Sequence, residues 1–277
     1  MNSSNFTPTL TQLRSLISHS IVATLLSLAC IACTAIVEAE ENLSYEVLTE
    51  QTQDPAIFTQ GFTKVDDTFY YSSGLYGRSF LKKETPEQPE RGKTFPLPKH
   101  IFAEGSTLLN GQLFLITWRE GLALMLDRET LQPKKQMRYQ GEGWGLTHNG
   151  KDLIMSNGSS DITFRNPDDF KPLRKISVHN AWRKYKNINE LEYAEGAIWA
   201  NVWQSALVLK ISPKDGRVLA IVNLDTLVKK HSSSPQRNVL NGIAYDEQRK
   251  AFWVTGKNWP RRYLVRFKQN TTTQETK

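Results

Sequence analysis

From Phe58 onward the sequence repeats one pattern five times, a pair of short apolar segments joined by a tight polar turn. Equivalent positions at the starts of the five repeats are separated by 44, 40, 45 and 52 residues. A period near 45 with about four strands per unit is typical of a β-propeller blade, whose sheet buries both faces against its neighbours. Five such units need about 225 residues. The sequence therefore predicts an all-β fold, a five-bladed β-propeller over residues 42–268.

The turns between the paired segments contain Asn, Asp, Glu and Gly. Two of them are Asn-Gly pairs, the strongest short-range signal for a hairpin. The five predicted turns are Asp66-Asp67, Asn110-Gly111, Asn149-Gly150, Glu195-Gly196 and Asp246-Glu247. Apolar segments at 122–127 and 206–211 predict third strands, and those at 134–139 and 218–222 predict fourth strands. Residues 84–98 contain four prolines and predict a loop between blades, whereas 224–230 could form a turn or two of helix.

Residues 1–39 are predicted to be a secretory signal peptide. Ile21 to Val37 are seventeen residues without a charge, and Arg14 is the only charged side chain before them. Small side chains at Val37 and Ala39 favour cleavage after Ala39. Two alternatives stay open, because the apolar stretch could span a membrane as an uncleaved anchor and a cysteine within it could be lipidated. We therefore expect an exported protein, periplasmic or secreted, with a polar tail at 269–277.

Export would leave a basic domain without cysteine. Cys30 and Cys33 both lie in the apolar stretch, so their C-x-x-C spacing does not indicate a redox or zinc site in the mature chain. Residues 42–277 lack Arg14 and three of the 28 acidic residues, and they keep 34 basic and 25 acidic side chains, a net charge of +9. The basic residues are scattered among acidic ones, which indicates a solvated surface and no nucleic-acid partner.

Polar and aromatic residues recur where a propeller would place its functional site. The first strand of each blade lines the central channel, so its polar start lies near one mouth of that channel. The five starts contribute Gln60, Glu104, Trp144, Asn189 and Asn241, and the ends of the following strands add Trp118, Asn157, Trp203 and Lys257. The predicted mouth combines one carboxylate and one lysine with amides and indoles. Trp199 and Trp253 are predicted to belong to the core.

Several long motifs, in the same order along the chain, resemble the plant and bacterial type of glutaminyl-peptide cyclotransferase. These motifs are FTQGF, SSGLYGRS, FAEGSTLLNGQLFLITWREG, YQGEGWGLTHNGKDLIMSNGSS, INELEYAEGAIWANVWQS and LNGIAYDEQRKAFWVTGKNWP, and they cover about Phe58 to Phe267. The resemblance implies a five-bladed propeller, an acyltransferase that converts the N-terminal glutamine of a peptide or protein into pyroglutamate and releases ammonia. It also implies that no cofactor is needed, and the histidines after residue 39 indeed lack metal-ligand spacing.

The implied reaction is an intramolecular aminolysis, which needs a proton shuttle between two nitrogens and a donor for the oxyanion. By resemblance Glu104 is the acid/base residue, Lys257 stabilises charge on oxygen, and Asn189 holds the substrate by hydrogen bonds. The expected substrate-binding residues are Gln60, Trp144, Trp203, Phe58, Phe102 and Trp118, with Trp144 and Trp203 as walls or N–H donors. Simpler roles remain open: Gln60 and Asn189 could cap strand ends, and Lys257 could neutralise Glu104 in a structural pair.

Two other classes of function remain compatible with the residues. A metal-dependent propeller hydrolase of the lactonase type could hold a cation with Glu104, Asn189 and Asn241, although Lys257 would repel that cation. A non-catalytic propeller could bind peptides at the same mouth. The segment 179–186, HNAWRKYK, departs from the resemblance by its basic and aromatic character and is predicted to form a rim loop. We expect a monomer without membrane contact beyond a possible N-terminal anchor.

Overall fold

The computed structural model describes residues 40–87, 92–231 and 239–270. The predicted signal peptide or anchor, residues 1–39, lies outside the described residues, as does most of the predicted polar tail. The chain divides into two units, Met1–Ala39 and Glu40–Lys277, and the fold below belongs to the second. Among the described residues, no helix has the length and apolar character that crossing a membrane requires.

The second unit is built almost entirely of β-strands. Three of its sheets contain four strands each, hydrogen-bonded in chain order as antiparallel meanders. The first contains β2 (Thr59–Val65), β3 (Thr68–Ser73), β4 (Phe80–Glu84) and β5 (Lys93–Pro96). The second contains β6 (Ala103–Leu109), β7 (Gln112–Thr117), β8 (Leu122–Asp127) and β9 (Pro133–Arg138). The third contains β10 (Leu146–His148), β11 (Leu153–Ser156), β12 (Asp161–Arg165) and β13 (Pro172–Ser177).

The remaining eight strands form one sheet in the order β14-β15-β16-β17-β1-β20-β19-β18. One half contains β14 (Ile188–Ala194), β15 (Ala197–Val202), β16 (Leu207–Ile211) and β17 (Val218–Asn223), followed by the short helix α2 (Asp225–His231). The other half contains β18 (Leu240–Asp246), β19 (Ala251–Gly256), β20 (Arg261–Gln269) and β1 (Glu41–Thr52). Strand β1 joins the halves, because it pairs parallel with β17 and antiparallel with β20.

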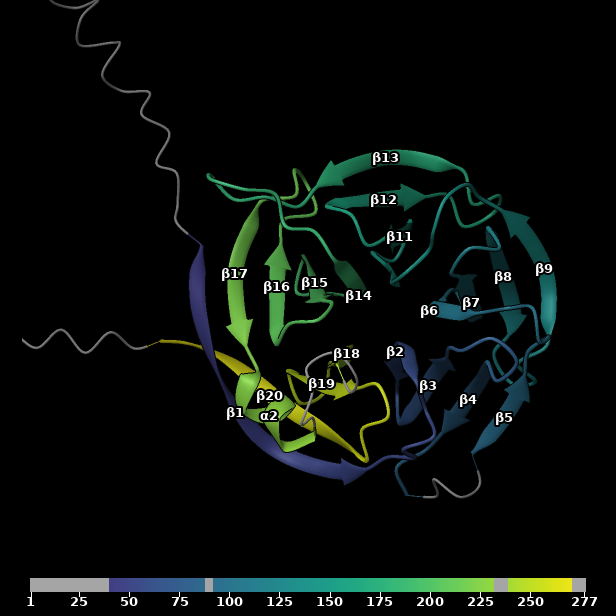
Figure 1. Cartoon of the computed structure of the whole chain (residues 1–277), viewed down its shortest axis with the longest axis horizontal. Coiled ribbons are helices and arrows are strands. Elements are labelled where there is room, and N and C mark those ends of the chain that lie inside the picture. The colour runs from purple at the N-terminus through teal and green to yellow at the C-terminus, as the bar shows by residue number, and fades with distance from the viewer. Residues whose placement is uncertain (1–39, 88–91, 232–238, 271–277) are drawn as a thin grey trace, which may run out of the picture. The chain divides into compact units, whose positions relative to one another are not determined.

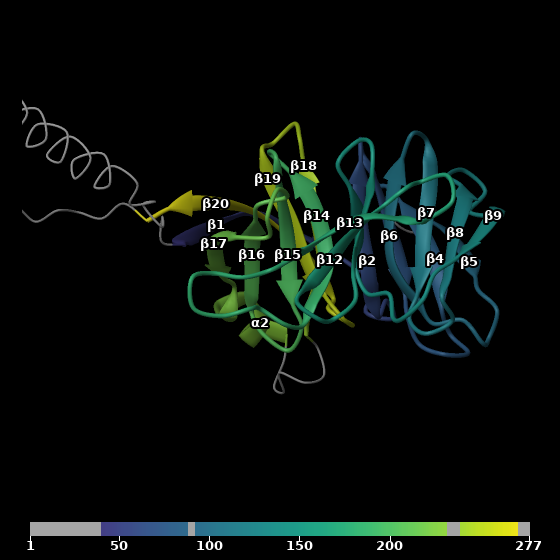
Figure 2. The ribbon, with the colours of Figure 1, turned by 90° about the horizontal axis from the view of Figure 1, so that it is seen from above.

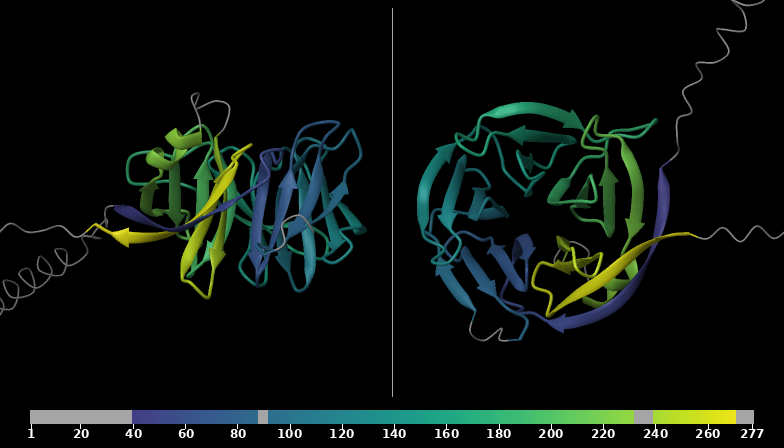
Figure 3. Two further views of the ribbon diagram at one scale, coloured as in Figure 1. Left: turned by 90° about the horizontal axis from the view of Figure 1, so that it is seen from below. Right: turned by 180° about the vertical axis from the view of Figure 1, so that it is seen from behind.

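The sheets are arranged around a central axis in a propeller-like way (Figure 1). The innermost strands β2, β6, β10, β14 and β18 contact one another in sequence around that axis, and β18 returns to β2. Seen from the side, most strands run roughly along the axis (Figures 2 and 3). Residues at the starts of the inner strands therefore gather at one end of the axis.

Glycines at these starts let the inner strands approach closely. A Cβ on Gly105 would lie 2.3 Å from the backbone nitrogen of Leu146, and one on Gly145 would lie 2.0 Å from the backbone oxygen of Asn189. Both distances are far below van der Waals contact, so a larger residue would push neighbouring sheets apart. The recurring polar-glycine pairs of the sequence thus mark places where the backbones of two sheets meet.

The hydrophobic core lies between adjacent sheets all the way around the axis. Phe62 and Phe69 of the first sheet, for example, pack against Trp253 and Leu264 of β19 and β20. Three further clusters fill the other interfaces between sheets, and a fourth lies between the two halves of the eight-stranded sheet. The prediction that Trp199 and Trp253 belong to the core is confirmed, since their side chains are 2% and 1% exposed. This arrangement explains why strands such as β7 and β19 are buried on both faces.

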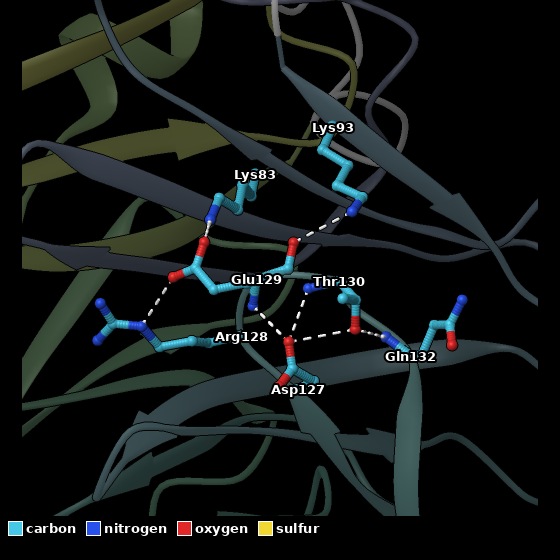
Figure 4. A network of polar contacts seen from close by, with 7 residues as sticks. All are labelled: Lys83, Lys93, Asp127, Arg128, Glu129, Thr130 and Gln132. Atoms are coloured by element: carbon cyan, nitrogen blue, oxygen red, sulfur yellow. Dashed lines mark hydrogen bonds and ion pairs between the residues drawn. The ribbon is translucent and has the colours of Figure 1, made fainter.

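Polar contacts also join neighbouring sheets at the surface. Glu129, in the β8–β9 turn, forms an ion pair with Lys83 of β4, and its backbone oxygen accepts a hydrogen bond from Lys93 of β5 (Figure 4). The turn itself is held by Asp127, whose carboxylate accepts the backbone N–H groups of Glu129 and Thr130 at 2.9 and 2.8 Å. Because Glu129 is largely exposed, its ion pair adds little to stability.

The predicted loop at 84–98 is wrong in part, because residues 93–96 form β5. Among the described strands, β5 pairs with β4 alone, so Pro96 needs no backbone N–H on its outer side. The turn predicted at Asp246-Glu247 is displaced to residues 247–250. The Asn110-Gly111 turn is confirmed: both residues have positive φ, of 50° and 74°, as this hairpin type requires. Strand β1 was not predicted at all.

Candidate active site

A cavity of about 650 Å³ opens where the inner strands begin. Its wall contains all nine residues that the sequence analysis selected as catalytic or substrate-binding: Phe58, Gln60, Phe102, Glu104, Trp118, Trp144, Asn189, Trp203 and Lys257. Three more residues, Leu75, Val239 and Asn258, complete the wall. The structure thus brings together residues that are spread over 200 positions of the sequence.

Glu104 is held in place by a short chain of amides. Its Oε1 accepts a hydrogen bond from Gln60 Nε2 at 3.0 Å, and Gln60 Oε1 in turn accepts one from Asn241 Nδ2 at 3.3 Å. Asn241 Nδ2 also donates to the backbone oxygen of Thr59 at 2.9 Å. Because Asn241 can only donate through Nδ2, it orients the Gln60 amide so that the Gln60 NH2 group faces Glu104.

Glu104 and Lys257 are both buried, at 5% and 6% exposure. Burial raises the pKa of Glu104 well above its usual value, an effect that the positive charge of Lys257 partly opposes. Burial likewise lowers the pKa of Lys257 from 10.5 to about 8, while Glu104 acts in the opposite direction. Within the described part of the chain, no ion pair of 4.0 Å or less joins the two groups. Both groups line the same cavity, and the charge of each affects the pKa of the other.

Lys257 and Asn189 each offer an unused polar group to the cavity. The Lys257 ammonium lies 4.8 Å from the centre of the Phe58 ring and forms no hydrogen bond with any described side chain. Asn189 is 2% exposed, and its Oδ1 has no hydrogen-bond partner among the residues that the structure describes. A buried acceptor without a partner is costly, so this oxygen is suited to an N–H group of a bound molecule.

Aromatic side chains form the rest of the wall. Phe102 and Trp118 lie with ring centres 5.4 Å apart. Trp144 and Trp203 meet edge to face, at 5.5 Å and 89°. The cavity therefore offers a mostly apolar surface around a few polar groups, as small-molecule and peptide-end sites usually do.

Comparison with known proteins identifies the chain. The family model described as glutamine cyclotransferase matches residues 20–267. The chain belongs to the glutamine cyclotransferase family. It is 37% identical to the glutaminyl-peptide cyclotransferase of Arabidopsis thaliana over 228 residues, which are 81% of this chain and 71% of the plant protein. It also resembles the crystal structure of Myxococcus xanthus glutaminyl cyclase, with a TM-score of 0.77 and 31% identity, over 84% of this chain and 100% of the bacterial one.

Three predicted positions lie away from the cavity wall in this member of the family. Asn241 lies behind Gln60, so the cation site considered with Glu104 and Asn189 is not assembled at the wall. Asn157 instead accepts hydrogen bonds from Ser159 in its own turn. The predicted rim loop at 179–186 contributes no residue to the wall, although its Trp182 is 91% exposed. Among the described residues, no three His, Cys, Asp or Glu side chains are grouped to hold a metal ion.

The sequence analysis did not select two glutamates, one bonded to residues of the cavity wall and one buried between the inner strands. Glu142 accepts hydrogen bonds from the indoles of Trp118 and Trp144. Glu190 is fully buried and accepts the backbone N–H groups of Phe62 and Ile243 at 3.2 and 2.9 Å, so it links β14 to β2 and β18. Glu190 occupies the repeat position at which the first three repeats have a glycine. This difference was the sequence signal by which Glu190 could have been found.

Proposed function

We propose that the chain is a glutaminyl-peptide cyclotransferase that converts the N-terminal glutamine of peptides or proteins into pyroglutamate and releases ammonia, without a metal. The observation that carries this proposal is the pairing of a buried carboxylate, Glu104, with a separate buried ammonium, Lys257, across one cavity in a member of this family. The non-catalytic alternative gives no reason for placing two such costly groups in a peptide-binding site.

Glu104 would move the proton between the two nitrogens. The neutral α-amine attacks the side-chain amide carbon, a C–N bond forms, and the amide oxygen becomes an oxyanion. Glu104 accepts the proton that the attacking nitrogen loses and gives it to the departing nitrogen. The old C–N bond then breaks, the carbonyl forms again, and NH3 leaves. A raised pKa suits both halves of this transfer, because the group must take up and release a proton near neutral pH.

Lys257 and Asn189 would supply the remaining interactions. The Lys257 ammonium, which forms no hydrogen bond with a described side chain, would stabilise the oxyanion. The unpaired Oδ1 of Asn189 would accept an N–H of the substrate α-amine and hold it toward the amide carbon. Gln60, fixed by Asn241, would keep the Glu104 carboxylate in one orientation. The aromatic residues would enclose the glutamine side chain and exclude water.

The finer features of the fold form part of the same proposal. We count the eight-stranded sheet as two blades, one from β14–β17 and one from β18–β20 with β1, which gives a five-bladed propeller over residues 42–268. The parallel pairing of β1 with β17 merges the two blades into one hydrogen-bonded sheet. We further propose that residues 1–39 export the protein to the periplasm or the medium, and that it acts as a monomer.

Mass spectrometry of a synthetic peptide beginning with Gln tests the activity directly. We expect the purified protein to remove one ammonia from the peptide faster than the spontaneous reaction, and a matched peptide beginning with Asn to stay unchanged. The same rate is expected after dialysis against EDTA. Loss of activity in EDTA and its return with Ca²⁺ or Zn²⁺ would instead support a metal-dependent enzyme.

The pH dependence of kcat should report the state of Lys257. Because burial lowers the pKa of this lysine to about 8, the ammonium loses its charge as the pH rises through about 8, and kcat should fall there. In Lys257→Arg the charge persists at higher pH, so the falling limb should move up by at least about one pH unit, even if the maximal rate is lower. A falling limb that stays in place in this variant, as in the exposed control Lys268→Arg, would exclude Lys257 as its cause.

A further inference from the structure

We infer that Glu142 is a positioning residue that orients two indole walls of the cavity and thereby sets the affinity for the substrate peptide. Glu142 lies in the segment between β9 and β10, two residues before Trp144. It is not part of the cavity wall itself. The inference rests on the proposed function, because it concerns the binding of the same peptide.

Glu142 accepts hydrogen bonds from two residues of the cavity wall and from a neighbouring arginine. Its Oε2 accepts the indole N–H groups of Trp118 and Trp144 at 2.9 and 3.0 Å. Its Oε1 accepts the Arg119 Nε–H group at 3.0 Å. One carboxylate oxygen therefore holds two tryptophans that come from different sheets, since Trp118 follows β7 and Trp144 precedes β10.

Each of these indoles in turn supports further aromatic residues. Trp118 packs against Phe102, and Trp144 meets Trp203 edge to face. Trp144 also leaves no space at Gly158, where a Cβ would lie 2.5 Å from the indole ring. A change at Glu142 would thus free both aromatic pairs of the wall at once.

Glu142 keeps its negative charge in this position. Burial acts to raise its pKa, but the hydrogen bonds from Trp144, Arg119 and Trp118 outweigh that effect, and the pKa falls below its usual value. Hydrogen bonds to a charged acceptor are stronger than neutral ones. The carboxylate is therefore a firm attachment point, although its side chain is 36% exposed.

The hydrogen bonds to Glu142 also limit the contacts that the indoles of Trp118 and Trp144 can make with a substrate. The N–H groups of Trp118 and Trp144 are already used, so these residues present only their ring surfaces to the cavity. Of the two roles expected for Trp144, a wall of the cavity or an N–H donor to the substrate, this hydrogen bond favours the wall. Trp203 is the remaining indole of the wall, and its N–H has no hydrogen-bond partner among the described residues.

Steady-state kinetics of three variants test the inference with a peptide beginning with Gln. Glu142→Ala should raise KM about tenfold and change kcat less than about threefold, because the walls contribute to binding before and during the reaction. Glu142→Gln keeps an oxygen that can accept both indole N–H groups, so its KM should stay within about threefold of the wild type. Glu129→Ala, a surface control with the same change of charge, should leave both constants unchanged.

A double-mutant comparison separates positioning from other roles. In a Trp118→Phe/Trp144→Phe background the N–H donors are gone, so adding Glu142→Ala should raise KM by less than about twofold. The quenching of tryptophan fluorescence by a pyroglutamyl peptide gives the affinity without turnover, and it should weaken in Glu142→Ala by the same factor as KM. An unchanged KM in Glu142→Ala, equal damage in Glu142→Gln, or additive effects in the double-mutant comparison would overturn the inference. A wild-type protein that converts no glutaminyl peptide would instead overturn the proposed function.

Discussion

Glu104→Gln is expected to lower kcat for ammonia release by about 10²–10⁴-fold, the usual contribution of a positioned acid/base group. The variant keeps the shape of the side chain and an oxygen that can accept the Gln60 hydrogen bond, but it cannot carry a proton between the two nitrogens. The measurement is the rate of ammonia release from a glutaminyl peptide at saturating concentration, followed over the pH range in which the wild type is active.

Binding and stability serve as controls for this variant. Because Gln has nearly the same volume as Glu and removes a buried acid, we expect the thermal midpoint to stay the same or rise. The affinity for a pyroglutamyl peptide should change only slightly, since the aromatic wall is intact. Glu104→Gln with kcat within a factor of three of the wild type would exclude Glu104 as the proton shuttle.

The second large effect is expected at a buried ion pair between the first and last sheets. Arg262 of β20 and Glu84 of β4 are 1% and 3% exposed, and their side chains lie 2.7 Å apart. Arg262 also donates to Gln51 Oε1 at 2.9 Å and to the Tyr71 hydroxyl. Glu84→Ala would leave the guanidinium buried with fewer partners, so the free energy of unfolding should fall by about 3–5 kcal/mol. Denaturation by urea, followed by circular dichroism, measures this loss.

Two further variants show whether the large loss of stability expected for Glu84→Ala is due to the burial of the ion pair. Glu129→Ala removes a similar ion pair at the surface, to Lys83, and should cost less than about 1 kcal/mol (Figure 4). Glu84→Leu combined with Arg262→Met should cost less than Glu84→Ala alone, because no unpaired charge remains buried. Equal losses in the free energy of unfolding for Glu84→Ala and Glu129→Ala would show that the buried ion pair contributes no more to holding the first and last sheets together than the exposed one does.

The strands could be predicted from the sequence because each repeat carries its own local signals. Apolar alternation and Asn-Gly turns act over a few residues, and the structure places β8, β9, β16 and β17 within one residue of the predicted segments. Strand β1 has no turn partner close in the chain. It pairs with β17 and β20, which lie more than 150 residues away in the sequence, so no local sequence pattern could predict this strand.

The composition of the cavity could also be predicted, because repeated starts of inner strands must meet at one end of the axis. Glu104, Lys257 and the indoles could be selected in this way, with help from motifs of the family. Their contacts could not be predicted. Asn241 occupies the same repeat position as Glu104, yet it is not part of the cavity wall, and its side chain instead donates to Gln60 and to the backbone oxygen of Thr59.

The sequence by itself thus determined the all-β fold, the spacing of its repeats and the residue types at the cavity, since these depend on short-range patterns and on their period. Only the tertiary structure decided which groups are paired and which are unpaired. Glu142 holds two indoles, Glu190 joins three inner strands, and Lys257 stays apart from Glu104. These outcomes depend on distances of a few ångströms between sheets, and such distances are set by how the sheets pack around the axis.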